Sequence, residues 1–152
     1  METRVVQNNL FFQEIARCIA NNERVRMRAK GNSMLPFIRD GKDEIVLEKT
    51  TYNSFQKGRL LLIKMPNENY ILHRVKKISG NNILLNGDGN LLLFENCSRE
   101  NAIAEATEVI RNGKSIKVGH FHWELYRLLW PKNYLLRRLG LALYRRIPFL
   151  NK

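Results

Sequence analysis

Ser33 lies in a segment whose composition suits a nucleophilic hydroxyl. The segment reads Gly-Asn-Ser-Met-Leu-Pro, so the serine stands between a flexible pair and a rigid Met-x-Pro, where a strand is expected to become a tight turn. Nucleophilic attack needs an exposed hydroxyl with a fixed direction, because the reacting atoms must be aligned at close range. Backbone N–H groups of the same turn, at Asn32, Ser33 and Met34, can stabilise the oxyanion that develops during attack. An ordinary loop serine is the alternative interpretation.

A histidine and an aspartate occur in two further segments of this kind. His73 lies in the apolar strand sequence Tyr-Ile-Leu-His-Arg-Val, and Asp88 in the turn-forming sequence Asn-Gly-Asp-Gly-Asn. Histidine is a natural general base because its reference pKa of about 6.5 is close to neutral pH. A carboxylate at Asp88 could orient the imidazole and stabilise its protonated form. Taken singly, the two segments also fit a structural histidine and an ordinary turn. Together with Ser33 they predict a catalytic serine, base and orienting acid.

These segments resemble sequence boxes of the signal peptidase I and LexA-like serine peptidase superfamily. Gly31–Pro36 resembles the G-x-S-M-x-P box, and Lys57–Leu62 resembles a second glycine-containing strand. His73–Val75 and Gly87–Asn90 resemble the H-R-V and G-D-N boxes of the archaeal and endoplasmic-reticulum branch, which uses histidine where other members use lysine. The resemblance covers roughly residues 24–118.

The resemblance implies a coiled, largely antiparallel β fold and a serine endopeptidase activity that needs no metal or organic cofactor. Ser33 would be the nucleophile, His73 the general base and Asp88 the supporting carboxylate. The expected substrate is a peptide or protein precursor, which such folds bind as an added β-strand. A second acidic residue often follows the G-D-N box in this family, and Glu95 is the nearest one in this sequence.

The chain departs from the family pattern at several positions. Lys42 and Arg59 replace two aspartates that follow glycines in the family's boxes, and Asp43 is the acid that could substitute locally. Gly31 stands where many signal peptidases have a serine that helps the oxyanion hole, so the second oxyanion donor is left unassigned. The sequence also has no stretch that resembles the family's transmembrane anchor, as in short forms of the family.

The elements around these segments are expected to form a mainly β body. Apolar periodicity predicts a helix over residues 9–22, and residues 102–110 fit either a helix or a strand. Turn-forming residues separate short strands, which we predict over residues 24–30, 44–49, 59–64, 70–78, 82–86, 91–94 and 115–118. Regular short strands with such turns favour an antiparallel sheet.

Composition and charge limit the classes of function. With 152 residues and 44% hydrophobic residues, the chain fits one ordinary globular domain with an appendage. Cys18 and Cys97 have no zinc-site spacing, and two free thiols are favoured over one bridge. The net charge of +12 attracts nucleic acid, anionic lipid or acidic substrates. A nucleic-acid-binding module and a catalytically inactive scaffold on the same fold are therefore the alternatives. No helix-turn-helix pair, RRM box or KH loop is present, so no specific nucleic acid is expected.

The C-terminal part has a different character. We divide the chain into a peptidase-like β domain with an N-terminal helix over residues 1–119 and a basic amphipathic helical tail over residues 120–152, which holds seven basic residues and one acidic residue. A helix is predicted over residues 133–147. One of its faces carries leucines and an isoleucine, and the other carries basic residues. The apolar residues are Leu136, Leu139, Leu143 and Ile147, and the basic ones are Arg137, Arg138, Arg145 and Arg146.

This pattern fits three kinds of contact. The leucines could pack on the β body, or the helix could bind a partner protein, or the four arginines could face an anionic membrane surface. The apolar runs elsewhere are far shorter than the roughly 18 residues that a membrane span needs, and no secretory signal is recognisable. A cytoplasmic location is therefore expected, with attachment at the inner membrane surface left open.

Overall fold

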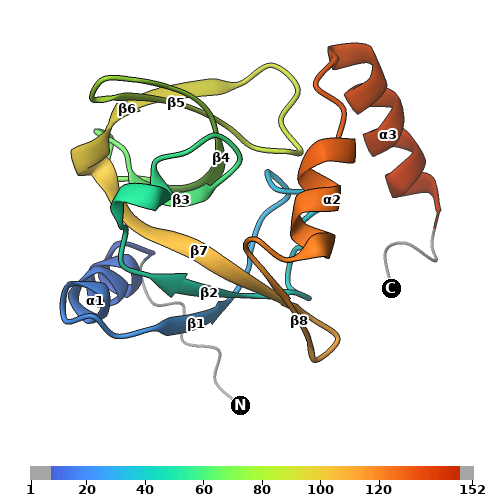
Figure 1. Cartoon of the computed structure of the whole chain (residues 1–152). Helices are drawn as coiled ribbons and strands as arrows, with labels where there is room; N and C mark the ends of the chain where they lie inside the picture. The colour runs from blue at the N-terminus through green and yellow to red at the C-terminus, as the bar shows by residue number, and fades with distance from the viewer. Residues whose placement is uncertain (1–7, 148–152) are drawn as a thin grey trace.

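An antiparallel sheet forms the body of the protein (Figure 1). The computed structural model describes residues 8–147, and within them the strand order is β1-β2-β7-β3-β4-β5-β6, with β8 paired to β7. Every strand pairing is antiparallel, so the predicted mainly β, antiparallel fold class is confirmed. The strands are β1 (Val25–Arg28), β2 (Glu44–Glu48), β3 (Leu60–Lys64), β4 (Tyr70–Ser79), β5 (Asn82–Asn86), β6 (Phe94–Ser98), β7 (Ala102–Arg111) and β8 (Lys114–Lys117).

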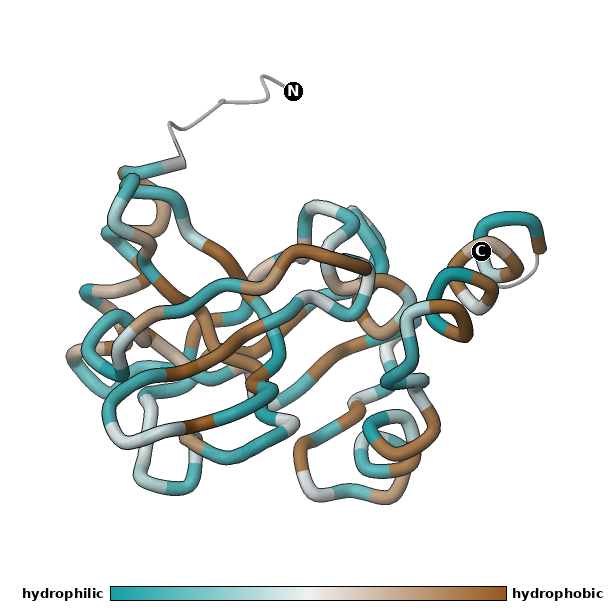
Figure 2. Tube along the Cα trace, turned by 90° about the horizontal axis from the view of Figure 1, so that it is seen from above, coloured by the Kyte–Doolittle hydropathy of each residue, from teal (hydrophilic) through white to brown (hydrophobic). Residues whose placement is uncertain are grey.

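Helices lie at both ends of this sheet. The described residues form the α-helices α1 (Asn8–Ala20), α2 (Phe121–Leu129) and α3 (Tyr134–Arg146), and the short 3₁₀ turns η1 (Tyr52–Ser54) and η2 (Arg99–Asn101). α1 packs against β1 and β7. α3 lies at the end of the molecule remote from α1, as the view from above shows (Figure 2). Within residues 8–147, no helix has both the length and the apolar character needed to cross a bilayer.

Most elements agree with the predictions from sequence. Residues 102–110, which fitted either a helix or a strand, form β7, the long strand that joins β2 on one side to β3 on the other. The strand predicted over residues 91–94 is wrong in position, because β6 begins only at Phe94 and the preceding Leu92 and Leu93 are exposed in a loop. Cys18 and Cys97 are free thiols, as predicted.

The sheet is buried on both of its faces. In β3, Leu60 and Leu62 belong to the main core, whereas Leu61 and Ile63 belong to a second core cluster. Side chains alternate between the faces of a strand, so a continuous apolar run is expected where both faces are covered. The coiling of the sheet therefore creates two apolar compartments, and β3 divides them.

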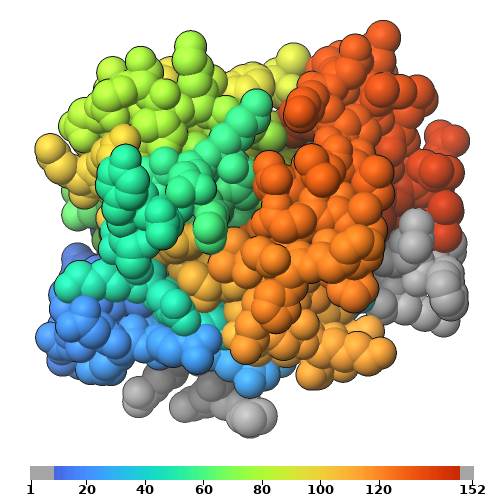
Figure 3. All heavy atoms as spheres, in the orientation of Figure 1, coloured from blue at the N-terminus to red at the C-terminus, as the bar shows by residue number. Residues whose placement is uncertain are grey.

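Helix α2 is part of the packed structure. Trp123 of α2 is 1% exposed and belongs to the main core, where its ring lies edge-on to Phe37 with 4.9 Å between centroids. Figure 3 shows the atoms of α2 and α3, coloured orange to red, gathered on one side of the molecule beside the green atoms of β4 and β5. Helix α3 agrees with the helix predicted over residues 133–147.

Candidate active site

The turn that carries Ser33 is anchored at both ends. Gly31 donates its N–H to Asp40 Oδ1 at 2.8 Å, and the Leu35 N–H donates to the Asn32 carbonyl at 3.2 Å. The side chain of Met34 is buried in the main core, whereas Ser33 is only half-buried. Gly31 has a φ of 99°, a conformation that favours glycine at the point where the chain leaves β1. The serine therefore lies on a fixed turn with its side chain accessible.

The glycine-rich loop after β5 packs directly on this turn. The Gly89 N–H donates to the Ser33 carbonyl at 2.8 Å. A Cβ on Gly87 would lie 2.3 Å from the Ser33 carbonyl oxygen, and one on Gly89 would lie 2.3 Å from the Asn32 carbonyl oxygen. Real Cβ atoms are not found so close to an oxygen, so both positions need glycine for the loop to approach. The Gly-Asp-Gly sequence thus supports the backbone of Ser33.

His73 presents its two ring nitrogens to different neighbours. Nδ1 lies 2.9 Å from Oε2 of Glu95 on β6, and both side chains are almost fully buried. Nε2 faces the serine turn, because a Cβ on Gly87 would lie 3.0 Å from His73 Nε2 and 2.3 Å from the Ser33 carbonyl oxygen. A carboxylate that accepts a hydrogen bond from Nδ1–H favours the neutral imidazole tautomer in which Nε2 carries no proton and can accept one.

Ser33, His73 and Glu95 line one pocket of about 320 Å³. Its remaining walls are mostly apolar and include Met27, Met34, Ile45, Leu62 and Leu72. Such a pocket, apolar with a few convergent polar groups, is the usual form of a ligand site. The predicted Ser33 and His73 are thus brought together by the fold.

Asp88 does not take the place expected for it. Its fully buried carboxylate is bound by Arg74, with Nε 2.9 Å from Oδ1 and Nη2 2.7 Å from Oδ2. His73 and Arg74 are consecutive in β4, so their side chains point to opposite faces of the strand, and Asp88 lies on the Arg74 side. The predicted pairing of Asp88 with His73 is therefore wrong, and the acid beside His73 is Glu95.

Arg74 ties several segments of the site together. Besides Asp88, it donates Nη1 to the Gly58 carbonyl at 2.8 Å. Its guanidinium lies 4.9 Å from the ring centroid of Phe37 and 5.6 Å from that of Tyr126. Burial of the Tyr126 hydroxyl strongly raises its pKa. Arg74 therefore positions the glycine-rich loop and the serine segment, a role that sequence reasoning missed although the residue directly follows His73.

The backbone N–H groups predicted to hold an oxyanion are free of internal partners. Within residues 8–147, the amides of Asn32, Ser33 and Met34 donate no hydrogen bond to another protein group. The side-chain Nδ2 of Asn90 lies near the Ser33 carbonyl, since a Cβ on Gly87 would be 3.0 Å from Nδ2 and 2.3 Å from that carbonyl oxygen. Asn90 also lines the pocket that Ser33 and His73 share. It is a candidate oxyanion donor that the sequence analysis did not identify.

Asp43 fixes the other end of the serine segment, where the sequence suggested a substitute for a family aspartate. It is fully buried and accepts hydrogen bonds from Arg39 Nε at 2.9 Å and Arg111 Nη2 at 2.7 Å. Burial alone would raise the pKa of this carboxyl, but the hydrogen bonds from Arg111 and Arg39 outweigh burial and lower it. A lowered pKa means that the contacts of the Asp43 carboxylate with the two arginines stabilise the fold at neutral pH. This contribution is lost as the pH falls through the lowered value.

Arg137 of α3 reaches the same loop from the other side. Its Nη2 donates to the carbonyls of Gly87, Asp88 and Asn90 at 3.0, 3.0 and 2.6 Å. The side chain is 4% exposed. The prediction that Arg137 faces a membrane surface is therefore wrong, because its buried guanidinium donates to the carbonyls of the glycine-rich loop.

Helix α3 buries Arg137 and exposes its leucine face, whereas simple amphipathic packing would bury the leucines. The inward stripe consists of Arg137, Gly140 and Leu141. The leucine face points away from the sheet, with Leu136, Leu139 and Leu143 all more than half exposed. The remaining predicted membrane-facing arginines, Arg138, Arg145 and Arg146, are exposed and form no ion pair with any residue of the described range.

Two comparisons of this chain with known proteins found no match. No model of a known protein family matches it, and no curated protein matches it. Over residues 8–147, the structure also contains no cluster of three or more histidine, cysteine or acidic side chains that could hold a metal ion. Ser33, His73 and Glu95 are therefore the residues whose geometry bears on the function of this chain.

Proposed function

We propose that this protein is a serine endopeptidase of the signal peptidase and LexA type, with Ser33 as nucleophile, His73 as general base and Glu95 as the acid that orients the base. One observation carries the proposal: His73 Nδ1 contacts Glu95 while Nε2 faces the Ser33 turn. This is the order of acid, base and nucleophile that serine hydrolases on unrelated folds share. Asp88 supports the site only through Arg74 and the loop.

The reaction follows from this arrangement. His73 Nε2 takes the Ser33 proton as Oγ attacks the scissile carbonyl carbon, and the carbonyl electron pair moves onto oxygen. The free N–H groups of the turn and Asn90 Nδ2 stabilise that oxyanion. The tetrahedral intermediate expels the amine, which takes the proton from His73 and leaves an ester on Ser33. Water, deprotonated by the same Nε2, then hydrolyses the ester and Ser33 regains its proton.

The edge of the sheet favours an extended peptide as substrate. β1 is the edge strand that leads directly into the serine turn, and it pairs only with β2 among the described strands. A peptide can add to such an edge through backbone hydrogen bonds, with alternate side chains entering pockets. The apolar walls of the 320 Å³ pocket suit one uncharged side chain of the substrate. We therefore assign a peptide or protein precursor as the substrate class.

A serine-reactive fluorophosphonate probe tests this proposal. We expect the probe to label the wild-type chain on Ser33, located by mass spectrometry of the digested adduct, because only an activated hydroxyl reacts quickly. Ser33→Ala should abolish labelling, and Ser79→Ala, which removes an exposed serine at the end of β4, should leave it unchanged. A folded wild-type chain that resists the probe would contradict the proposal and favour an inactive scaffold.

We further propose that the outer face of α3 attaches the enzyme to an anionic membrane surface, which would place a cytoplasmic enzyme at the inner membrane. Leu136, Leu139 and Leu143 are 57%, 66% and 60% exposed, so this apolar surface has no cover in the described part of the chain. Exposed arginines lie on the same helix, which has no acidic residue. Each cation near such a surface contributes about 1 kcal/mol of attraction.

The leucines can be tested without disturbing the fold, because they are exposed. We expect the wild-type chain to co-sediment with vesicles that contain phosphatidylglycerol, less so as salt rises, and not with neutral vesicles. Replacing Leu136, Leu139 and Leu143 together by glutamine should abolish co-sedimentation and leave the melting temperature nearly unchanged. Tyr52→Gln, at a residue 85% exposed on η1, is the control for lost apolar surface. A wild-type chain that ignores anionic vesicles at low salt would rule attachment out.

A further inference from the structure

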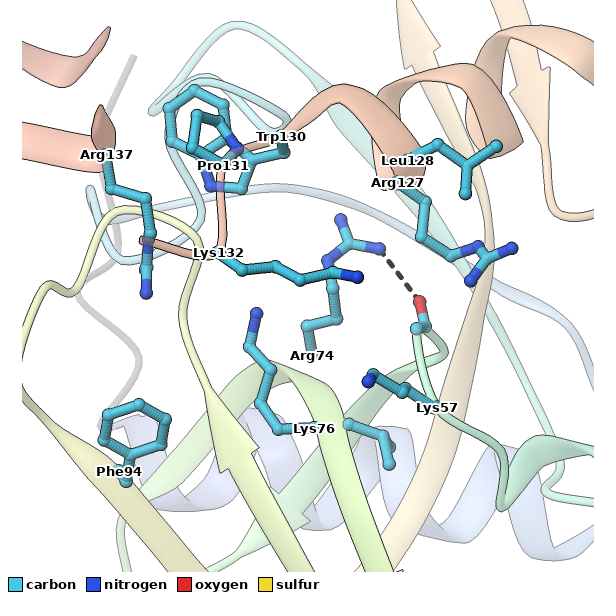
Figure 4. A pocket seen from close by; sticks show the side chains of 12 residues that line it. Lys57, Arg74, Lys76, Phe94, Arg127, Leu128, Trp130, Pro131, Lys132 and Arg137 are labelled. Carbon is cyan, nitrogen blue, oxygen red and sulfur yellow. Dashed lines mark hydrogen bonds between the residues drawn. The ribbon is translucent and has the colours of Figure 1, made fainter. Parts of the chain in front are cut away.

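A second pocket lies on the face of β4 opposite His73 and is lined by cations. Its volume is about 250 Å³, and it lies between β4, the Lys57-Gly58 turn, α2 and the start of α3. Figure 4 shows the side chains of Lys76 and Lys132 extending into its centre. Its basic residues are Lys57, Arg74, Lys76, Arg127, Lys132 and Arg137.

Only two of these six cations have an acidic partner. Arg74 pairs with Asp88, and Arg127 pairs with Glu124 at 2.6 Å. The other four form no ion pair with any residue between positions 8 and 147. None of the residues that line the pocket is acidic. Unpaired cations around one pocket repel each other, and no acidic lining residue offsets this repulsion.

Two residues that line this pocket also carry buried donors without acceptors. Arg137 is 4% exposed, and its Nε is buried without a hydrogen-bond partner, although Nη2 is fully used by the loop carbonyls. The indole Nε1 of Trp130, another lining residue, is buried and unpartnered as well. A buried donor with no acceptor is costly, and a charged one especially so.

The local backbone directs one lysine into the pocket. The pairing of β4 with β5 shifts register between Val75 and Lys77, so Lys76 is the extra residue of a β-bulge. Bulges redirect side chains and often occur beside functional sites. Burial lowers the pKa of Lys76, and although Asp88 opposes this effect, Arg137, Arg74 and Lys57 lower the pKa further. The lysine is thus held where its charge is disfavoured unless an anion is present.

We propose that this pocket binds a phosphate-type anion, contributed by a free phosphate compound or by a phospholipid headgroup. Phosphate oxygens accept several charge-assisted hydrogen bonds at once, which suits the ammonium groups of Lys57, Lys76 and Lys132 around the pocket. The anion would link β4, the Lys57 turn and α3, and through Arg137 it would reinforce the loop that supports Ser33. This inference does not depend on the proposed peptidase activity.

The test compares two double variants that lose the same charge. Lys57→Gln/Lys76→Gln removes two pocket cations, whereas Lys77→Gln/Lys117→Gln removes two exposed lysines outside the pocket. Pyrophosphate is titrated into the full chain by calorimetry at physiological salt. We expect binding to weaken about a hundredfold in the pocket variant, since each hydrogen bond to a charged group corresponds to about tenfold in affinity. The control variant should bind like the wild type.

A vesicle arm distinguishes the two sources of phosphate. Vesicles that contain phosphatidic acid, and vesicles matched in charge with phosphatidylglycerol, are sedimented with the same variants, each also carrying Leu136→Gln, Leu139→Gln and Leu143→Gln so that α3 no longer attaches the chain. Loss of sedimentation in the pocket variant alone assigns the site to a lipid headgroup, and loss of pyrophosphate binding alone assigns it to a free anion. Pyrophosphate should also raise the melting temperature of the wild type but not of the pocket variant. If neither ligand distinguishes the two double variants, the proposal is wrong.

Discussion

Replacing Ser33 or His73 is expected to remove nearly all peptidase turnover, and replacing both should cost little more than replacing one. The two side chains act in the same step, because the serine attacks only as the histidine takes its proton. Residues that act as a unit in this way show strongly non-additive losses, about 10⁴–10⁶-fold in kcat for serine proteases. The measurement is kcat on a peptide that the wild-type enzyme cleaves, found by screening a peptide library.

The variants must keep the fold for this comparison to be informative. His73 is 3% exposed, so His73→Gln is the second variant beside His73→Ala, because its amide can still hydrogen-bond to Glu95. His122→Ala, at an exposed histidine of α2, is the matched control and should retain full activity. A folded His73→Gln protein that cleaves at a rate near the wild type would refute the role of His73 as the base.

Ser33 and His73, the proposed nucleophile and base, could be singled out from the sequence because their signals are local. Ser33 stands at a strand-to-turn junction that the composition of six residues specifies, and His73 interrupts an apolar strand. A strand at Leu60–Ile63 could likewise be predicted from its apolar residues alone, since β3 is buried on both faces. Local patterns predict such elements well because burial and backbone conformation follow from neighbours in the sequence.

The orienting acid could not be predicted in the same way. Glu95 reaches His73 only because β6 pairs with β5 and β5 pairs with β4, which is a matter of register across three strands. Asp88 is closer to His73 in sequence, but it lies on the opposite face of β4 with Arg74. A shift of one position reverses the face to which a side chain points, so the choice between the two acids depends on tertiary structure.

The orientation of α3 was also beyond the sequence. Amphipathic periodicity correctly predicts the helix, and it suggests that the leucines face inward. In the structure Arg137 faces inward and donates to the carbonyls of Gly87, Asp88 and Asn90. These polar contacts hold the arginine side of the helix against the loop, and the leucine face is left exposed. A docking contact between one arginine and three loop carbonyls leaves no periodic signal in the sequence.

The choice between the two acids leads to the second large expected effect. We expect Glu95→Gln to lower kcat about 10⁴-fold while the protein stays folded, because a neutral amide can donate to Nδ1 and hold the wrong imidazole tautomer. With the proton on Nε2, His73 can no longer accept the proton of Ser33. Glu100→Gln, the same change at an exposed acid of η2, should leave kcat unchanged. The readouts are kcat and the melting temperature of each variant.

Asp88→Asn should lower the stability of the fold rather than kcat. It leaves the buried Arg74 without its carboxylate, and breaking such a pair typically costs about 3–5 kcal/mol of folding free energy. We therefore expect a large drop in melting temperature, with kcat per folded molecule reduced far less than in Glu95→Gln when both are measured well below the melting transition. The opposite pattern, an active Glu95→Gln protein and a folded but inactive Asp88→Asn protein, would return the orienting role to Asp88. Stability and turnover thus separate the acid that holds the loop from the acid that holds the base.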